Sequence, residues 1–139
     1  MSKAKTMTLT LKRVIPAVPA KVYAAWMDPK QACNPWNHGK KLVFSPKVNG
    51  LFYVLMQGGT PHFGRFTGMA RGRQVSHTWM SPYTRGLESA VTVTFKKQGT
   101  GTLMTLRHGG LPNDDFGMAH NDGWGYFLGQ IEKRFKAKR

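Results

Sequence analysis

The sequence predicts a single α+β domain in which one curved antiparallel sheet of about seven strands faces a long C-terminal helix. Segments of alternating apolar and polar residues, rich in β-branched side chains, recur between turn signals from residue 41 to residue 108. A stripe of apolar residues at helical spacing follows them. The length of 139 residues suits one domain, and no linker or repeat divides it. We therefore expect one domain over 1–139, with its core at about 7–135.

The first part of the chain predicts one strand and two short helical segments. Residues 7–15 alternate in polarity, and Pro16 ends this strand. Pro19 suits the first turn of a helix, because a proline there sacrifices no helical hydrogen bond. The residue before a proline is steered away from helical geometry, so the Asp28-Pro29 pair ends this helix. We expect a second short helical turn at about 29–36.

The middle of the chain predicts a meander of six strands. Each strand is bounded by glycine, proline or asparagine, and Asn49-Gly50 is a strong hairpin signal. The expected strands cover 41–48, 51–57, 62–70, 75–80, 88–97 and 102–108.

The C-terminal segment predicts a long amphipathic helix. Residues 113–115 (Asn-Asp-Asp) offer N-cap chemistry, and the basic residues at 133–139 suit the negative end of a helix. Gly123 and Gly125 are unusual inside a helix and indicate close backbone packing or a local break. The apolar stripe that defines the helix consists of Trp124, Leu128, Ile131 and Phe135.

The chain is strongly basic, with 21 Lys and Arg against 6 Asp and Glu and a formal net charge of +15. Such a charge favours contact with polyanions. The excess is spread along the chain, however, and no motif of the usual RNA-binding modules accompanies it. Tyr53, Phe63 and Tyr83 resemble an aromatic platform only superficially. We therefore expect no specific nucleic-acid partner.

Other features narrow the class of protein further. The longest apolar runs, at 22–27 and 51–56, are too short to cross a bilayer, and the start of the chain shows no secretory signal. The single cysteine, Cys33, excludes an internal disulfide and a cysteine-based zinc site. It has no activating neighbour in sequence, so we expect a buried, inert thiol. These features predict a cytoplasmic protein with no membrane partner.

Eight short motifs, taken in order, resemble those of the START-like (SRPBCC) superfamily, whose architecture is the helix-grip fold. Within it, the chain is most similar to the bacterial family named for homology to the C-terminal domain of the activator of the 90-kDa heat-shock-protein ATPase. Members often carry two glycines where this chain has Asn49-Gly50. The motifs are found at 13–17, 22–29, 49–53, 66–68, 77–79, 91–95, 101–110 and 122–124.

The resemblance implies a cavity between the sheet and the C-terminal helix, and it fixes which strand faces point inward. Strand alternation then sorts the side chains into an apolar, aromatic lining with two histidines. We expect it to bind a small hydrophobic molecule that is lipid-like, aromatic or polyketide-like. An ordinary packed core is the alternative. The expected ligand-binding residues are Phe52, Val54, Met56, His77, Trp79, Val93, Met104, His108, Trp124 and Leu128.

Two further functions stay open. A cyclase-type enzyme would use His77 or His108 to move a proton, although buried histidines more often serve structure. A co-chaperone-like activator of a heat-shock-protein ATPase, active in the stress response, is the other. The co-chaperone's extra N-terminal domain has no counterpart here, which argues against this function.

We assign no catalytic residue and expect no cofactor. The histidines at 62, 77, 108 and 120 lack compact metal-ligand spacing, so no metal site is expected. Leu51, Tyr53 and Leu55 would point away from the core. They are either covered by a loop or support self-association, so the expected state is a monomer or a weak homodimer.

Overall fold

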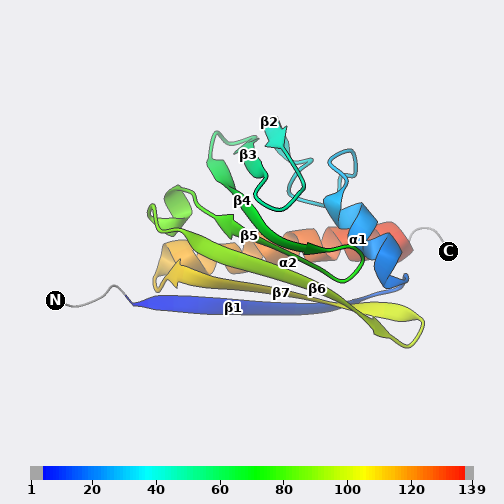
Figure 1. Ribbon diagram of the computed structural model, residues 1–139. Helices are drawn as coiled ribbons and strands as arrows, with labels where there is room; N and C mark the ends of the chain where they lie inside the picture. Colours follow the sequence, from blue (N-terminus) through cyan, green and yellow to red (C-terminus); the bar gives the residue numbers. More distant parts are fainter. Residues whose placement is uncertain (1–4, 137–139) are drawn as a thin grey trace.

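The computed structural model describes residues 5–136 and has the predicted α+β architecture (Figure 1). Seven strands, two α-helices and one short 3-10 turn at Pro82–Thr84 follow one another in these residues. The elements are β1 (Thr6–Ile15), α1 (Pro19–Met27), β2 (Gly39–Phe44), β3 (Leu51–Met56), β4 (Pro61–Ala70), β5 (Gln74–Trp79), β6 (Ser89–Gln98), β7 (Gly101–Pro112) and α2 (Asp115–Lys136).

All seven strands form one antiparallel sheet in the order β1-β7-β6-β5-β4-β3-β2. The meander β2 to β7 places consecutive strands side by side, and the first strand pairs with the last. Figure 1 shows α2 running along one face of the sheet, with α1 beside its C-terminal half. The apolar strand faces are therefore buried against α2, α1 and, for β2, β3 and β4, the ring of Trp36 in the connection after α1.

The segment at 29–36 consists of turns and not of the expected second helical turn. The side chain of Asn34 explains the difference, because its amide donates hydrogen bonds of 2.8 Å to the Ala25 carbonyl and 2.7 Å to the Asp28 carbonyl. Pro29 and Pro35 also lack the amide hydrogens that a helix needs. The connection from α1 to β2 is thus fixed by side-chain hydrogen bonds.

The N-terminal cap of α2 is the one that the sequence predicts. One carboxylate oxygen of Asp114 accepts hydrogen bonds from the amides of Phe116 and Gly117, at 2.9 and 3.1 Å. The other accepts a hydrogen bond of 2.6 Å from Nε of Arg85, which joins the helix start to the segment after β5. These bonds hold the pKa of the Asp114 carboxyl below its usual value.

The middle of α2 shows neither the local break nor the close backbone packing that was expected at Gly123 and Gly125. The helix continues through Gly123 and Gly125 with no break, and no described atom lies within 4 Å of a Cβ placed on Gly123. The close packing occurs one and a half turns earlier, at Gly117. At the basic end, Lys136 forms an ion pair of 2.8 Å with Glu132, whereas Lys138 and Arg139 lie outside the described residues.

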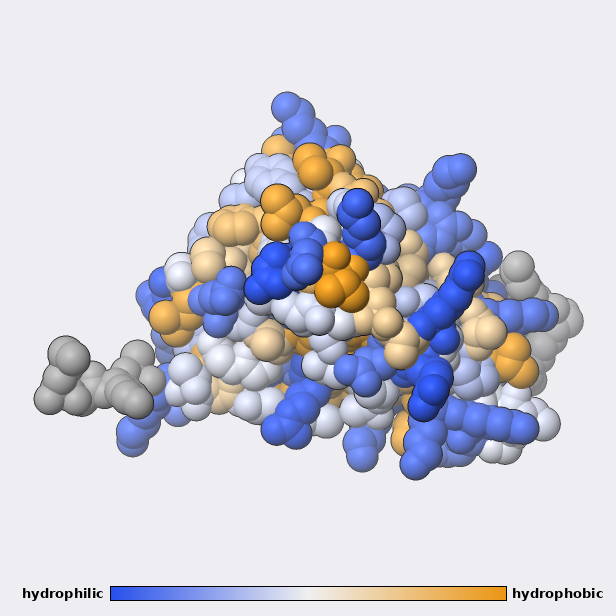
Figure 2. Space-filling view, viewed as in Figure 1, coloured by the Kyte–Doolittle hydropathy of each residue, from blue (hydrophilic) through white to orange (hydrophobic). Residues whose placement is uncertain are grey.

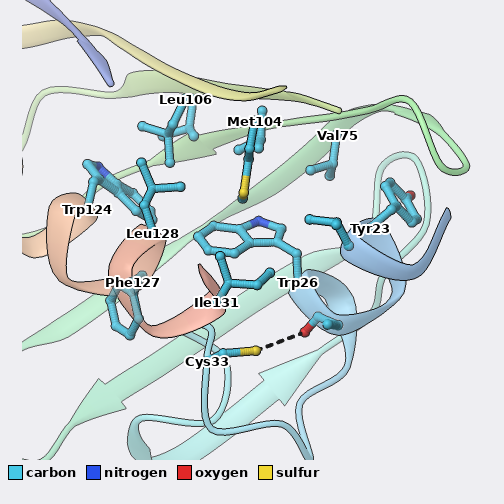
Figure 3. Packing of buried hydrophobic residues seen from close by; sticks show 14 of the residues in the cluster. Tyr23, Trp26, Cys33, Val75, Met104, Leu106, Trp124, Phe127, Leu128 and Ile131 are labelled. Atoms are coloured by element: carbon cyan, nitrogen blue, oxygen red, sulfur yellow. Dashed lines mark hydrogen bonds between the residues drawn. The ribbon is translucent and has the colours of Figure 1, made fainter. Parts of the chain in front are cut away.

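The core lies between α2, α1 and the inner face of the sheet (Figure 3). The ring of Trp26 on α1 occupies its centre, close to Met104 and Ile131, and lies 6.3 Å from the Trp124 ring between centroids. The inward strand faces are confirmed by burial. Of the residues predicted to face inward, those buried are Phe52, Val54, Val75, His77, Trp79, Val91, Val93, Phe95, Met104, Leu106 and His108, and Met56 is half-buried.

Gly117 sets how closely α2 approaches β7. A Cβ at this position would lie 1.8 Å from the carbonyl oxygen of Pro112, so backbone would have to move. We expect Gly117→Ala to lower the free energy of unfolding by about 1–3 kcal/mol, the usual cost of overpacking. Chemical denaturation measures it.

The matched control is Gly129→Ala on the same helix, where no described atom lies within 4 Å of the added Cβ. That variant should be neutral or gain up to about 1 kcal/mol from helix propensity. Equal effects of the two substitutions would contradict the close approach at Gly117.

Candidate functional site

A cavity of about 490 Å³ opens where the β3–β4 turn, the 3-10 turn and the first half of α2 meet. Its volume lies within the range of small-molecule sites. A second hollow, of about 590 Å³ near α1, is lined by charged residues such as Lys21, Asp28 and Arg134, and it lacks the aromatic walls of the first. The first cavity is lined by Met56, Gly58, Thr60, His62, Trp79, Tyr83, Ala119, His120, Gly123, Trp124, Tyr126 and Phe127.

Aromatic rings form most of the cavity wall, and Trp79 is at their centre. Its ring lies 4.8 Å from the ring of His62 on β4 and 5.0 Å from the ring of Trp124 on α2, between centroids. Phe127 packs at 6.4 Å from Trp124 one turn further along the helix. Rings contributed by β4, β5 and α2 suit an apolar guest that itself carries a ring.

The structure divides the ten sequence-predicted ligand residues into two groups. Met56, Trp79 and Trp124 line the cavity. The other seven lie in the packed core with at most 2 % of their surface exposed, and none of these described side chains lines the cavity. These are Phe52, Val54, His77, Val93, Met104, His108 and Leu128.

The sequence reasoning missed five ring-bearing residues of the cavity: His62, Tyr83, His120, Tyr126 and Phe127. Two periodic signals could have found three of them. Alternation backwards along β4 from the buried Phe66 places His62 on the inner face. Helical spacing around Trp124 places His120 one turn earlier and Phe127 one turn later. Tyr83 belongs to a short turn with no such periodicity.

His108 is held in one tautomer by a chain of buried hydrogen bonds. The indole Nε1–H of Trp124 donates to His108 Nδ1 at 2.9 Å, so this nitrogen carries no proton. His108 Nε2–H therefore donates to Ser89 Oγ at 2.7 Å. The Ser89 hydroxyl in turn donates to the carbonyl oxygen of Trp79. Both nitrogens of His108 are thus occupied.

Burial keeps these histidines neutral. It lowers the pKa of His108 to about 2, with further lowering from His120, His77 and His62. Burial also lowers the pKa of His77 to about 4, and a hydrogen bond of 2.8 Å to the Thr78 carbonyl only partly opposes it. Neither ring lines the cavity, so the geometry gives neither of them contact with a cavity-bound substrate.

The two histidines that line the cavity are neutral for the same reason. Burial lowers the pKa of His62 to about 4, and it lowers that of His120 as well. His120 Nδ1 lies 3.2 Å from the carbonyl oxygens of both Phe116 and Gly117 on its own helix. The cavity therefore presents neutral imidazole rings at neutral pH.

Cys33 is buried, and its Sγ lies 3.7 Å from the carbonyl oxygen of Ala25 (Figure 3). Burial raises the pKa of this thiol, which is the opposite of what a nucleophile needs. Across residues 5–136, no three His, Cys, Asp or Glu side chains come together in a group that could hold a metal ion. Neither helix of that region is long and apolar enough to span a bilayer.

The fold and the cavity define a helix-grip domain of the START-like class. The model of the family described as "Activator of Hsp90 ATPase homolog 1-like protein" matches residues 16–136, and the chain belongs to that family. A search of curated proteins finds no match.

Solved structures of the same fold come from several organisms. A protein of Chromobacterium violaceum is 22 % identical with a TM-score of 0.77, covering 92 % of this chain and 96 % of its own. The Aha1 dimer of Colwellia psychrerythraea is 17 % identical with a TM-score of 0.76, covering 93 % and 96 %. An HSP90 activator of Plasmodium falciparum is 22 % identical with a TM-score of 0.74, covering 91 % and 94 %. At these identities the likeness shows the fold.

The depressed pKa of His77 predicts how stability depends on pH. The unfolded chain binds a proton at His77 near pH 6.5, whereas the folded protein binds it only near pH 4. Stability contributed by the neutral ring is therefore lost as the pH falls through this window, at about 1.4 kcal/mol per pH unit. His77→Phe removes that loss and keeps a ring against Trp36, Phe52 and Phe66.

The measurement is the free energy of unfolding in urea between about pH 6 and pH 5, where the slope should be shallower in His77→Phe by about 1 kcal/mol per unit. His108 continues to contribute the same sign of slope in both proteins. An unchanged slope would show that His77 is protonated in the folded state.

Proposed function

We propose that the protein binds a small, mainly apolar molecule with a flat ring system in the cavity between the β3–β4 turn, β5 and α2. The observation that carries the proposal is the aromatic cavity of about 490 Å³. A closed core at this end of the sheet would leave no such volume, because protein interiors pack without voids of ligand size. The proposed contacts from the ten predicted residues are Met56, Trp79 and Trp124.

The composition of α2 supports the proposal. The cavity borders the stretch of the helix that carries Ala119 and Gly123, two exposed residues whose small size leaves open space at the cavity rim. One turn later, Phe127 and Leu128 are buried and close that space. Glycine at position 123 makes the helix less stable than alanine would. Its presence in the cavity wall is therefore consistent with selection for the volume of the cavity over the stability of the helix.

The cyclase-type function finds less support. His77 and His108 were its proton-moving candidates, and both are buried outside the cavity with partners fixed by the fold. We therefore favour binding over catalysis.

Filling the cavity tests the proposal directly. Gly123→Leu adds a side chain at a cavity-lining position where no described atom lies within 4 Å of its Cβ, so the fold should tolerate it. The neutral fluorescent probe N-phenylnaphthylamine should bind the wild-type protein saturably. We expect its affinity to fall at least about tenfold in Gly123→Leu, because the leucine occupies the volume that the probe needs.

Gly129→Leu is the matched control, since Gly129 has equal space around its Cβ among the described atoms and is not in the cavity wall. It should bind the probe as wild type does. The proposal fails if the wild-type protein shows no saturable binding, or if both variants lose affinity equally.

A second candidate function is self-association through the outer face of β2, β3 and β4. Val43, Tyr53 and Phe63 stand in register on these strands, with Leu51 and Leu55 beside them. Leu51 is 61 % exposed and Val43 59 %, so in the part of the chain that the structure describes no loop covers them, whereas Tyr53 and Leu55 are half-buried. Figure 2 shows apolar surface over this part of the sheet, with hydrophilic residues around it. We call these five residues the outer patch.

The outer patch predicts a weak homodimer. Wild-type protein should show a mass that rises with concentration in light scattering, most clearly at high salt, which screens the repulsion between two basic copies. Leu51→Lys should abolish the rise, because it places a charge within the contact at its most exposed residue. Thr10→Lys adds the same charge on exposed β1 and should not. A wild-type monomer at high concentration contradicts this prediction.

Activation of a heat-shock-protein ATPase is the alternative that the family description supports. The outer patch would then contact the chaperone, and the cavity would have no part in it. ATPase stimulation that survives Gly123→Leu and is lost in Leu51→Lys would favour this function over ligand binding.

A further inference from the structure

The strands of this protein carry lysine and arginine but no acidic residue. Every Asp and Glu of the chain lies in α2 or in a segment between elements. Both helices pack against the inner face of the sheet, so neither of them covers the outer face (Figure 1). Positive charge on the outer face therefore has no acidic side chain on a neighbouring strand to neutralise it. The acidic residues are Asp28, Glu88, Asp114, Asp115, Asp122 and Glu132.

A row of polar side chains crosses the outer face of β1, β7, β6 and β5. Lys12 is paired with Thr105, Thr105 with Thr94, and Thr94 with Gln74. Residues that pair directly across antiparallel strands point to the same side of the sheet. Lys12 and Gln74 are exposed and the two threonines are half-buried, so all four side chains belong to the outer surface.

A second row runs parallel to the first, two residues further along each strand. Here Thr10 is paired with Arg107, Arg107 with Thr92, and Thr92 with Ser76. Thr10 and Arg107 are exposed. The hydroxyl oxygens of Ser76 and Thr92 lie 3.3 Å apart. The two rows together present hydroxyl groups beside positive charges, and neither row contains an apolar side chain.

The cations of this surface come from distant parts of the sequence. The strand order β1-β7-β6 places Lys12, Arg107 and Lys96 on three adjacent strands, with Lys96 two residues from Thr94 on the same face. The ion pairs among residues 5–136 involve other cations, so these three have no carboxylate partner there. Figure 2 shows hydrophilic side chains projecting below the outer patch, over these strands. We call the two rows and Lys96 the basic face.

The composition of the basic face indicates which polyanion fits it. Arg, Lys, Ser, Thr and Gln are the side chains that make most contacts to the phosphate groups of DNA. Segments that bind a membrane surface add apolar side chains that enter the headgroup region, and the two rows have none. Single-stranded nucleic acid is held by bases that stack on aromatic rings, and the two rows contain no ring. A double-stranded nucleic acid backbone is the partner that remains.

We propose that the basic face binds the phosphate backbone of a double-stranded nucleic acid without reading its sequence. The four strands span about 14 Å, because adjacent strands lie about 4.8 Å apart. One strand of a duplex carries a phosphate about every 3.4 Å along the axis, so several phosphates lie within reach. The contact reads no base, so it requires no sequence-reading motif. It goes beyond ligand binding in the cavity and does not depend on it.

The test is fluorescence anisotropy with a labelled DNA duplex of arbitrary sequence, measured between about 50 and about 200 mM salt. The affinity of the wild-type protein should fall steeply as salt rises. Each phosphate contact contributes about 0.9 to the slope of log K against log salt, so Lys12→Gln/Arg107→Gln should make the slope shallower by about 1.8. Its affinity at the lowest salt should be at least about tenfold weaker.

The matched control is Lys30→Gln/Lys133→Gln, which removes the same charge at two exposed positions outside the sheet. It should keep the wild-type slope. Equal loss in the two double variants would show that net charge alone acts, and it would overturn the basic face. Lys96→Gln by itself should make the slope shallower by about 0.9, which gives a separate readout if the first double variant does not fold.

The remaining outcomes identify other partners. Absence of salt-dependent duplex binding by the wild-type protein overturns the proposal. Tighter binding of single-stranded DNA than of the duplex overturns it in favour of a base-stacking surface. Binding to phosphatidylserine vesicles that depends on Lys12 and Arg107, without duplex binding, assigns the face to a membrane. Gly123→Leu should bind the duplex as wild type does, so failure of the cavity proposal leaves this one standing.

Discussion

The hydrogen bond from the Trp124 indole to His108 Nδ1 connects the helix layer to the sheet beside the cavity, and the position of the cavity wall depends on it. It joins α2 to β7 inside the core, and Ser89 and the Trp79 carbonyl extend it to β6 and β5. Every donor in this chain has one acceptor, so the position of the helix and the tautomer of the histidine are fixed together. The Trp79 and Trp124 rings that these bonds position are two walls of the cavity.

The two halves of α2 differ in how they meet the sheet. The C-terminal half packs against it in a filled core, whereas the N-terminal half borders the cavity. Towards its C-terminus, Leu128 and Ile131 meet the sheet with Trp26 between the layers. Towards its N-terminus, Ala119 and Gly123 present almost no side chain, and the space is lined by rings from the sheet. Side-chain size along one helix therefore decides where the interior is filled. Among the described residues, no Lys, Arg, Asp or Glu lines the cavity.

Membership of the activator-like family establishes the fold, whereas the chemistry of the cavity has to be argued from this chain's own residues. The residues that bear on function are few, and they come from separate elements: His62 from β4, Trp79 from β5, and His120 and Trp124 from α2. The outer patch is a separate feature on the opposite face of the sheet, so the proposals of ligand binding and of self-association can be tested independently.

The sequence by itself determined most of the elements and which side chains share a face, because alternation along a strand and spacing along a helix are local properties of the chain, and the family resemblance set which face points inward. Phe52, Val93 and Leu128 are buried as this periodicity requires. Only the tertiary structure decided which buried residues face a cavity, since that depends on where the ends of distant elements meet. In the structure, Tyr83 and His120 line the cavity, whereas His77 and His108 lie in the packed core. Residues 29–36 form turns around Asn34 and not the expected helical turn. Hydrogen-bond partners such as Ser89 and Trp124 lie 19 and 16 residues from His108, beyond the reach of any local pattern.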